Sequence, residues 1–184
     1  MGNTLSIIIQ PVGSVELDSV DWLSRNLARR IPLDVEMLPV SWRLTPPLSL
    51  FDFERMQYKA SELVVWLYKE YKDYLKAPRN FVLGIVEGDG YVEGLNFVFG
   101  VARSDIRVAV VFTKRLQAGS QNLFRERLLK ETIHELGHLM GLGHCENRRC
   151  VMSFSNSIME VDLKDASFCD KCKSRLIKLY GNPE

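Results

Sequence analysis

Hydrophobic and polar residues follow two different spacings along the chain, and these spacings separate expected strands from expected helices. Short apolar runs bounded by Pro, Gly or Asn predict buried β-strands. Apolar residues three or four positions apart, with charged residues between them, predict amphipathic helices. The expected strands are residues 5–10, 33–38, 81–86, 96–101 and 106–113, and the expected helices are residues 15–30, 56–75, 121–142 and 166–179.

The order of these elements predicts a mixed sheet. The first three strands are separated by helices, and such crossovers favour parallel neighbours. The short links around residues 94–104 instead favour an antiparallel strand at the edge of the sheet. We therefore expect an α/β (α+β mixed) fold with a mixed, mostly parallel sheet. No repeat or linker divides the chain, so residues 1–184 are expected to form a single domain.

Charge and hydropathy exclude several classes of partner. The chain has 24 basic and 23 acidic residues, which gives no electrostatic reason to expect nucleic acid or an anionic membrane as a partner. No apolar stretch approaches the length of a membrane-spanning helix, and residues 5–9 are too short for the core of a secretory signal. We therefore expect a cytoplasmic protein with reduced thiols, and nothing in the sequence demands more than a monomer.

The residues that bind metals best are concentrated in one segment. All three histidines and all four cysteines lie between His134 and Cys172, and residues 1–133 contain neither type. Scattered structural histidines or buried cysteines would not cluster in this way. The distribution predicts a scaffold in residues 1–133 and a double metal site in residues 134–172.

The first half of that segment, residues 134–144, places three histidines and a glutamate at fixed spacing. His134 and His138 are four residues apart, which on a helix puts both rings on one face at about 5–6 Å between Cβ atoms. They can therefore bind one zinc ion. Glu135 is turned by roughly 100° from His134, so it can reach a water on that ion and act as general base.

His144 can join this site only if the helix ends before it. On a continued helix it would lie about 9 Å beyond His138 along the axis. Gly141 stands where a helix favours a left-handed residue at its end. We therefore expect a helix break at Gly141 that lets His144 become the third ligand. Without Gly141 and His144, the HExxH of residues 134–138 would be a weak signal for a metal site. The alternative to a zinc site is a chance motif on a helix that carries core histidines.

Three protein ligands leave one coordination position open, which is typical of a catalytic zinc site. The expected reaction is peptide hydrolysis: zinc-bound water, activated by Glu135, attacks the scissile carbonyl, and Glu135 then protonates the leaving amine. A zinc-stabilised peptide-binding module with little or no catalytic activity is the alternative. Glu135 favours the enzyme, because a binding site needs no carboxylate there.

The four cysteines suggest a second metal. They are Cys145, Cys150, Cys169 and Cys172. Two close pairs separated by a loop suit a tetrahedral, structural zinc with four thiolate ligands. The alternatives are two disulfides or a redox pair, and a nucleic-acid-binding zinc module is a third reading of the pattern. A reducing compartment argues against disulfides, a redox pair leaves the first two cysteines unexplained, and the near-neutral charge argues against nucleic acid.

The motif resembles a known group of peptidases. Residues 134–144 match HExxHxxGxxH, the zinc signature of the metzincins. The continuation C-x4-C-x-M, followed by C-x2-C at residues 169–172, resembles the archaemetzincins specifically. The resemblance implies a compact metzincin-like domain with an active-site helix, a Met-turn and a C-terminal helix. It also implies two zinc ions, one catalytic and one structural.

Two further expectations come from this resemblance. The Met-turn is expected at Met152, with Met159 as the rival candidate. Metzincins bind peptide or protein substrates as an extra strand along the edge of the sheet. The edge expected here consists of Asn96, Phe97, Val98, Phe99 and Gly100.

Overall fold

The structure, a computed structural model, describes residues 4–181 and is built on a five-stranded sheet in the order β2-β1-β5-β8-β7. The first four of these strands are parallel, and β7 runs antiparallel to β8 at the edge. The expected mixed sheet with an antiparallel edge strand is therefore confirmed. The strands are β1 (Leu5–Val12), β2 (Val35–Pro39), β5 (Asn80–Val86), β7 (Gly100–Arg103) and β8 (Val108–Phe112).

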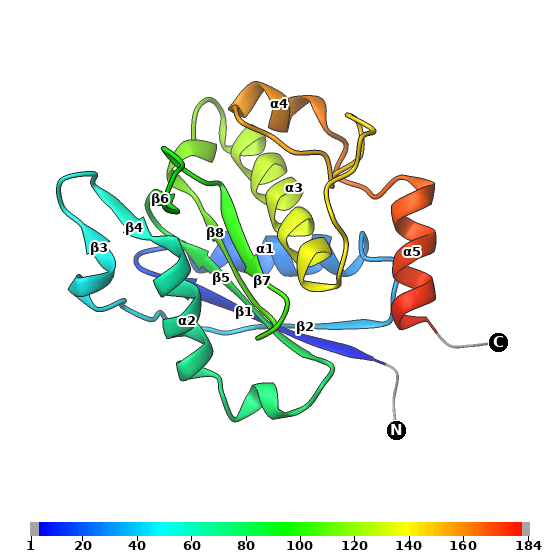
Figure 1. Ribbon diagram of the computed structural model, residues 1–184, viewed down its shortest axis with the longest axis horizontal. Coiled ribbons are helices and arrows are strands. Elements are labelled where there is room, and N and C mark those ends of the chain that lie inside the picture. Colours follow the sequence, from blue (N-terminus) through cyan, green and yellow to red (C-terminus); the bar gives the residue numbers. More distant parts are fainter. Residues whose placement is uncertain (1–3, 182–184) are drawn as a thin grey trace.

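Helices cover both faces of this sheet, as Figure 1 shows. α1 (Leu17–Ala28) and α3 (Gln121–Leu139) pack on one face, and α2 (Ala60–Glu70) packs on the other. Successive residues of β5 contribute to opposite cores: Leu83 lies under α1 and α3, whereas Val82 lies under α2. Because both faces are buried, the central strands are apolar throughout rather than alternating.

The expected helix at residues 56–75 begins four residues late. Its first residues instead form β4 (Gln57–Lys59), which pairs with β3 (Phe51–Asp52) and β6 (Gly90–Tyr91) in a small second sheet. β3 and β6 lie outside the strands and helices that the hydrophobic pattern predicts. The pairing of β4 with β6 joins segments more than thirty residues apart in sequence, so the local hydrophobic pattern could not indicate it.

The expected strand at residues 96–101 was correct only at its end. Strand β7 begins at Gly100, and residues 96–99 are irregular apart from one bridge between Val98 and Gly90. Phe97 and Phe99 made this segment resemble a strand in hydropathy. Their rings pack against each other edge to face at 5.2 Å. Residues two positions apart in a strand also lie on the same face, so hydropathy alone could not distinguish this irregular segment from a strand.

The last part of the chain wraps over the end of α3. A short helix that the sequence pattern did not reveal, α4 (Ile158–Leu163), precedes the expected C-terminal helix α5 (Asp170–Tyr180). α5 starts later than expected because the backbone before it bonds elsewhere: the Val151 N–H donates to Ser167 O at 3.0 Å.

Short 3-10 turns occur at Leu48–Leu50, Tyr74–Lys76 and Lys114–Leu116. Among the described residues, no helix has the length and apolar character needed to cross a bilayer.

Candidate metal centre

The histidine cluster is assembled by the end of α3 and the turn that follows it. α3 ends at Leu139, and Gly141, two residues later, has a φ of +86°. The Gly141 N–H donates to His138 O at 3.0 Å, and the Leu142 N–H donates to Gly137 O at 2.9 Å. This pair of bonds is a Schellman motif, which requires a left-handed residue at that position. The chain reverses there, and His144 returns to face the two helical histidines.

The three rings offer nitrogen atoms to a common point. The candidate ligand atoms of His134, His138 and His144 all lie within 4.8 Å of one another. The Nε2 atoms of His134 and His138 are 3.0 Å apart. Two nitrogens bound to one tetrahedral zinc at about 2.0–2.1 Å are about 3.3 Å apart. The donor set therefore fits zinc without rearrangement of the helix.

Backbone carbonyls orient two of these rings. His134 Nδ1 lies 2.8 Å from Val151 O, and His138 Nδ1 lies 2.8 Å from Leu142 O. An Nδ1–H that donates to a carbonyl leaves the Nε2 lone pair free for a metal. Burial lowers the pKa of both His134, well below its ordinary value, and His138, which favours the neutral, metal-binding form. Sequence reasoning missed these acceptors, because any residue supplies a carbonyl.

Glu135 lies one residue along the helix and is packed tightly against the sheet edge. A Cβ atom on Gly100 would lie 2.6 Å from Glu135 Cγ and 2.7 Å from its Oε1, so only glycine fits at that position of β7. Burial raises the pKa of Glu135 well above its ordinary value, and the nearby Glu131 carboxylate raises it further. A carboxyl group with a raised pKa is suited to accept and return a proton near neutral pH.

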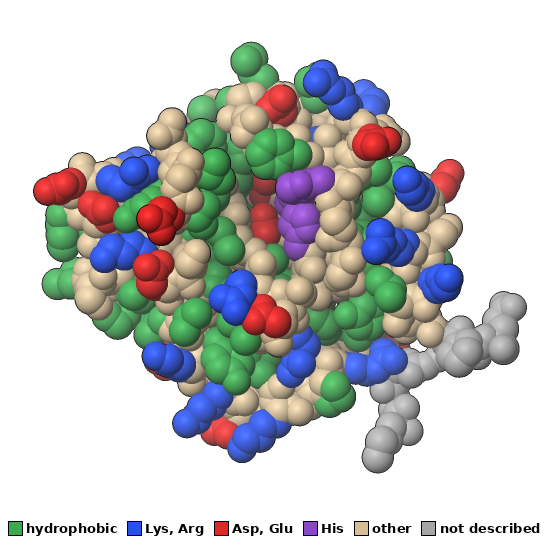
Figure 2. All heavy atoms as spheres, in the orientation of Figure 1, with side chains coloured by type: hydrophobic (Ala, Val, Ile, Leu, Met, Phe, Trp, Pro, Cys, Tyr) green, Lys and Arg blue, Asp and Glu red, His purple; other side chains and the backbone are tan. Residues whose placement is uncertain are grey.

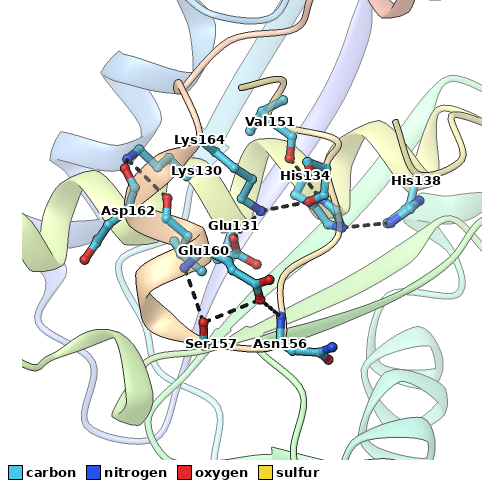
Figure 3. Close-up of polar contacts among 12 residues, drawn as sticks. Lys130, Glu131, His134, His138, Val151, Asn156, Ser157, Glu160, Asp162 and Lys164 are labelled. Atoms are coloured by element: carbon cyan, nitrogen blue, oxygen red, sulfur yellow. Dashed lines mark hydrogen bonds and ion pairs between the residues drawn. The ribbon is translucent and has the colours of Figure 1, made fainter. Parts of the chain in front are cut away.

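A buried ion pair that the sequence did not predict lies beside Glu135. Lys164 Nζ is 2.8 Å from Glu131 Oε1 and also donates to Ser153 O at 3.2 Å. Figure 3 shows Lys164 reaching from the end of α4 toward α3. The Lys164–Glu131 pair joins α3 to the segment between Cys150 and Cys169. Glu131 is four residues before Glu135, so its position on the same helix face was detectable; nothing local identified Lys164 as its partner.

The three histidines, Glu131 and Glu135 line a cleft of about 550 Å³. Figure 2 shows the histidines in a hollow of the surface, with acidic side chains beside them and hydrophobic side chains along one flank. The expected edge residues Asn96 to Gly100 all line this cleft, although only Gly100 belongs to a strand. Phe154 also lines the cleft, and its ring centroid is 5.0 Å from that of His144.

The two methionine candidates differ in position. Met152 is fully buried, whereas Met159 is 71% exposed. A Cβ atom on Gly137 would collide with Met152 Sδ, so Met152 lies directly against α3 at the turn that carries the first two histidines. Met159 is too exposed to form an apolar contact beneath the histidines.

The four cysteines converge on a second point. All four thiols are free, and their sulfur atoms lie within 4.8 Å of one another. Cys145 Sγ is 3.8 Å from Cys169 Sγ, and burial raises the pKa of the Cys172 and Cys150 thiols. Four thiolates this close repel one another unless a cation offsets their charge, and such a set suits a closed tetrahedral zinc site. The Cys145 N–H also donates to Met152 O at 2.9 Å, so the two sites share one loop.

The chain is similar in sequence to a family of known peptidases. The model of Peptidase family M54 matches residues 19–178. The archaemetzincin of Aeropyrum pernix is 41% identical over 182 residues, which cover 99% of this chain and 98% of the relative. The archaemetzincin of Methanocaldococcus jannaschii is 37% identical over 178 residues, with 94% and 93% covered.

Solved structures show the same similarity. Archaemetzincin from Methanopyrus kandleri superposes with a TM-score of 0.81 at 34% identity, covering 98% of each chain. Archaemetzincin from Archaeoglobus fulgidus, solved in complex with malonate, gives a TM-score of 0.80 at 36% identity, covering 93% of this chain and 99% of its own. The match in sequence and fold extends along nearly the whole chain, including the 133 residues that carry no motif. The chain therefore belongs to Peptidase family M54.

Proposed function

We propose that this chain hydrolyses peptide bonds with a zinc ion held by His134, His138 and His144 and with Glu135 as general acid/base. The class of reaction, zinc-dependent peptide hydrolysis, follows from its membership of the M54 peptidases. One observation carries the assignment of roles: three histidine nitrogens converge within 4.8 Å in the same cleft as a buried carboxylate.

The proposed mechanism gives each side chain one task. Zinc, when bound, supplies a Lewis acid that polarises the scissile carbonyl and lowers the pKa of a water. Glu135 takes a proton from the attacking water and delivers it to the leaving nitrogen. The raised pKa of Glu135 favours this exchange. Val151 O and Leu142 O keep two histidine rings in the tautomer that presents Nε2.

We also propose a second, structural zinc on Cys145, Cys150, Cys169 and Cys172, with Met152 as the Met-turn. The free thiols within 4.8 Å of one another and the full burial of Met152 support these assignments. Gly141 is the helix break that brings the third histidine into place. Because Cys145 follows His144 directly, the structural ion would stabilise the segment that carries the third ligand.

The substrate is proposed to be a peptide or protein segment that adds to the edge of the sheet. β7 pairs with β8 on one side and ends the sheet order on the other, which suits addition of an extended peptide. The edge then consists of Gly100–Arg103, and residues 96–99 form a wall of the cleft. We further propose a cytoplasmic monomer of one domain. The near-neutral charge supports only the part of this proposal that excludes nucleic-acid and membrane partners.

Zinc content per chain tests the two-site proposal. The wild type is purified without added metal beside His138→Ala and Cys172→Ser, each of which removes one ligand from a different site. We expect two zinc ions in the wild type and one in each variant by elemental analysis. Equal zinc in the wild type and His138→Ala, also after zinc addition, would remove the histidine site from the proposal.

Activity is tested with zinc-loaded protein on a peptide library. Glu135→Gln keeps the size of the side chain but cannot accept the proton, so we expect it to retain two zinc ions and lose at least about 10³-fold in kcat. Turnover that persists in Glu135→Gln would contradict the role of Glu135. Tight peptide binding without hydrolysis by the wild type would identify a binding module instead.

A further inference from the structure

One wall of the cleft, here called the rim segment (residues 95–99), has little regular structure to hold it. Its backbone bonds are those from the Leu95 N–H to Val92 O at 3.1 Å, from the Val98 N–H to Gly90 O at 2.8 Å and from the Phe112 N–H to Phe99 O at 2.8 Å. Phe97, between them, lies in no strand, yet it lines the cleft together with His134. Other groups must therefore fix the shape of this wall.

Two polar side chains hold the backbone of the rim segment. Arg55 Nη2 donates to Leu95 O at 3.2 Å and to Asn96 O at 3.0 Å. The buried Gln57 donates to the same Asn96 O at 3.0 Å and to Asp89 Oδ2 at 3.0 Å. Both anchors come from the small second sheet or its hairpin, so that sheet acts as a support for the cleft.

The side chain of Phe97 is held separately, by Arg115. Asp89 is 5% exposed and binds Arg115 through three close contacts: Nε lies 2.9 Å from Oδ1 and 3.0 Å from Oδ2, and Nη2 lies 2.8 Å from Oδ2. The guanidinium carbon lies 4.0 Å from the centroid of the Phe97 ring. A guanidinium held at several points keeps its plane over the ring, which a single-point ammonium cannot do.

We propose that Arg115, anchored on Asp89, is a positioning residue for substrate binding that holds the Phe97 ring in the cleft wall. The inference rests on the proposed function. Arg115 is not among the residues that line the cleft, so it acts through Phe97. The surrounding wall is apolar, with Leu95, Val98, Phe99 and Val101 beside Phe97. This wall fits a bulky apolar side chain of the substrate, and the fixed ring sets how well that side chain is bound.

A double-mutant cycle tests the coupling between the two residues. Arg115→Lys retains a positive charge beside the buried Asp89 but removes the planar guanidinium that lies over the Phe97 ring. Zinc-loaded Arg115→Lys, Phe97→Ala and the double variant are compared on short peptides with one Leu scanned through a Gly-Ser background. Arg25→Lys, on an exposed position of α1, is the matched control.

We expect Arg115→Lys to raise KM for the best Leu peptide by about fivefold to tenfold, with kcat within about twofold. Counterpart peptides with Ala in place of Leu should show little change, and the double variant should match Phe97→Ala alone. If the increase in KM of the double variant equals the product of the two single increases, the residues act independently and the proposal is overturned. A parallel loss of kcat and thermal stability, or equal effects on Leu and Ala peptides, would reduce Arg115 to a purely structural role.

The same cycle is repeated as a binding measurement in the Glu135→Gln background. The dissociation constant of the fluorescein-labelled Leu peptide replaces KM, so the cycle needs no turnover. If the wild type cleaves no peptide faster than Glu135→Gln does, the proposed function fails. Non-additive dissociation constants would still support the role of Arg115, and additive ones would overturn it.

Discussion

Gly100, which lines the cleft, and Gly137 of α3 show how a single residue can fix the packing near the histidines. Gly100 lies against Glu135, and Gly137 lies against Met152. In each case a Cβ atom would occupy space that a functional side chain fills. Neither glycine has the positive φ recorded for Gly141, so their role is close packing rather than backbone conformation. These contacts make both positions sensitive to the smallest substitution.

Gly100→Ala should lower kcat by about 10–100-fold, because the new methyl group displaces the Glu135 carboxylate and small misplacements of a catalytic group are costly. Steady-state kinetics on a fluorogenic peptide measure the change. Zinc content should stay at the wild-type value, since the methyl group meets Glu135 rather than a histidine. An unchanged kcat would show that Glu135 can move without loss of function.

Gly137→Ala should destabilise the metal-loaded protein by about 1–3 kcal/mol through overpacking against Met152. Alanine favours a helix by about 1 kcal/mol over glycine, so a loss of stability would point to the clash. Urea unfolding measures the effect. In a Met152→Ala background the same substitution should cost much less, because the sulfur atom is gone. An equal cost in both backgrounds would mean that Met152 does not lie against the helix.

At the scale of elements, α4 depends on contacts with α3 rather than on its own length. It has six residues, too few to be stable alone. Arg127 of α3 binds Asp162 of α4 through Nε and Nη2, each at 2.6 Å. Lys164, directly after α4, forms the buried pair with Glu131. These contacts explain why the hydrophobic pattern did not reveal the helix.

The Arg127–Asp162 pair predicts a pH-dependent contribution to stability. The hydrogen bond from Arg127 lowers the pKa of Asp162 from its ordinary value of 3.8. The Asp162 carboxylate therefore takes up a proton less readily in the folded state than in the unfolded state. The stability that this pair contributes is complete above about pH 4 and is lost as the pH falls through the lowered pKa of Asp162. Since the Asp162 side chain is 35% exposed, we expect Asp162→Asn to cost about 1 kcal/mol at pH 6.

Chemical denaturation of the wild type and Asp162→Asn between pH 6 and pH 2 checks this prediction. The difference in unfolding free energy should shrink toward zero at the acid end. Asp105→Asn serves as control, because its partner Arg103 lies on the exposed surface and such pairs contribute little. A difference that stays constant with pH would show that the carboxylate charge of Asp162 is not what stabilises the contact.

At the scale of the whole molecule, the proposed structural zinc would hold together the segment from Cys145 to Cys172, which follows α3. The Cys145 N–H bonds Met152 O, and the Val151 N–H bonds Ser167 O. Both bonds lie in the loop that the four cysteines close. Loss of that ion should therefore loosen the loop and leave the sheet intact.

Hydrogen exchange on Cys172→Ser tests this separation. The amides of Cys145 and Val151 should exchange at least about tenfold faster than in the wild type, because local opening no longer breaks metal bonds. The Val82 amide, which donates to Arg107 O at 3.1 Å within the sheet, should keep its wild-type rate. Uniformly faster exchange would indicate global destabilisation instead.

The sequence by itself determined the features that depend on local geometry or composition. The i, i+4 spacing of His134 and His138 and the left-handed Gly141 gave the turn that brings in His144, because helix geometry and glycine conformation need no distant partner. The order of apolar segments gave the mixed sheet with its antiparallel edge. The clustering of Cys residues near the histidines predicted the group of four thiols that the structure brings within 4.8 Å of one another.

Only the tertiary structure decided which distant segments meet. β4 pairs with β6, Lys164 meets Glu131, Gly100 lies against Glu135, and Arg115 lies over Phe97. A hydrophobic pattern records which residues avoid water, but many distant partners satisfy the same pattern equally well. Packing and the pairing of buried charges select one of them. The proposed ligands were therefore evident from the sequence, whereas the wall of the cleft and the groups that position it were not.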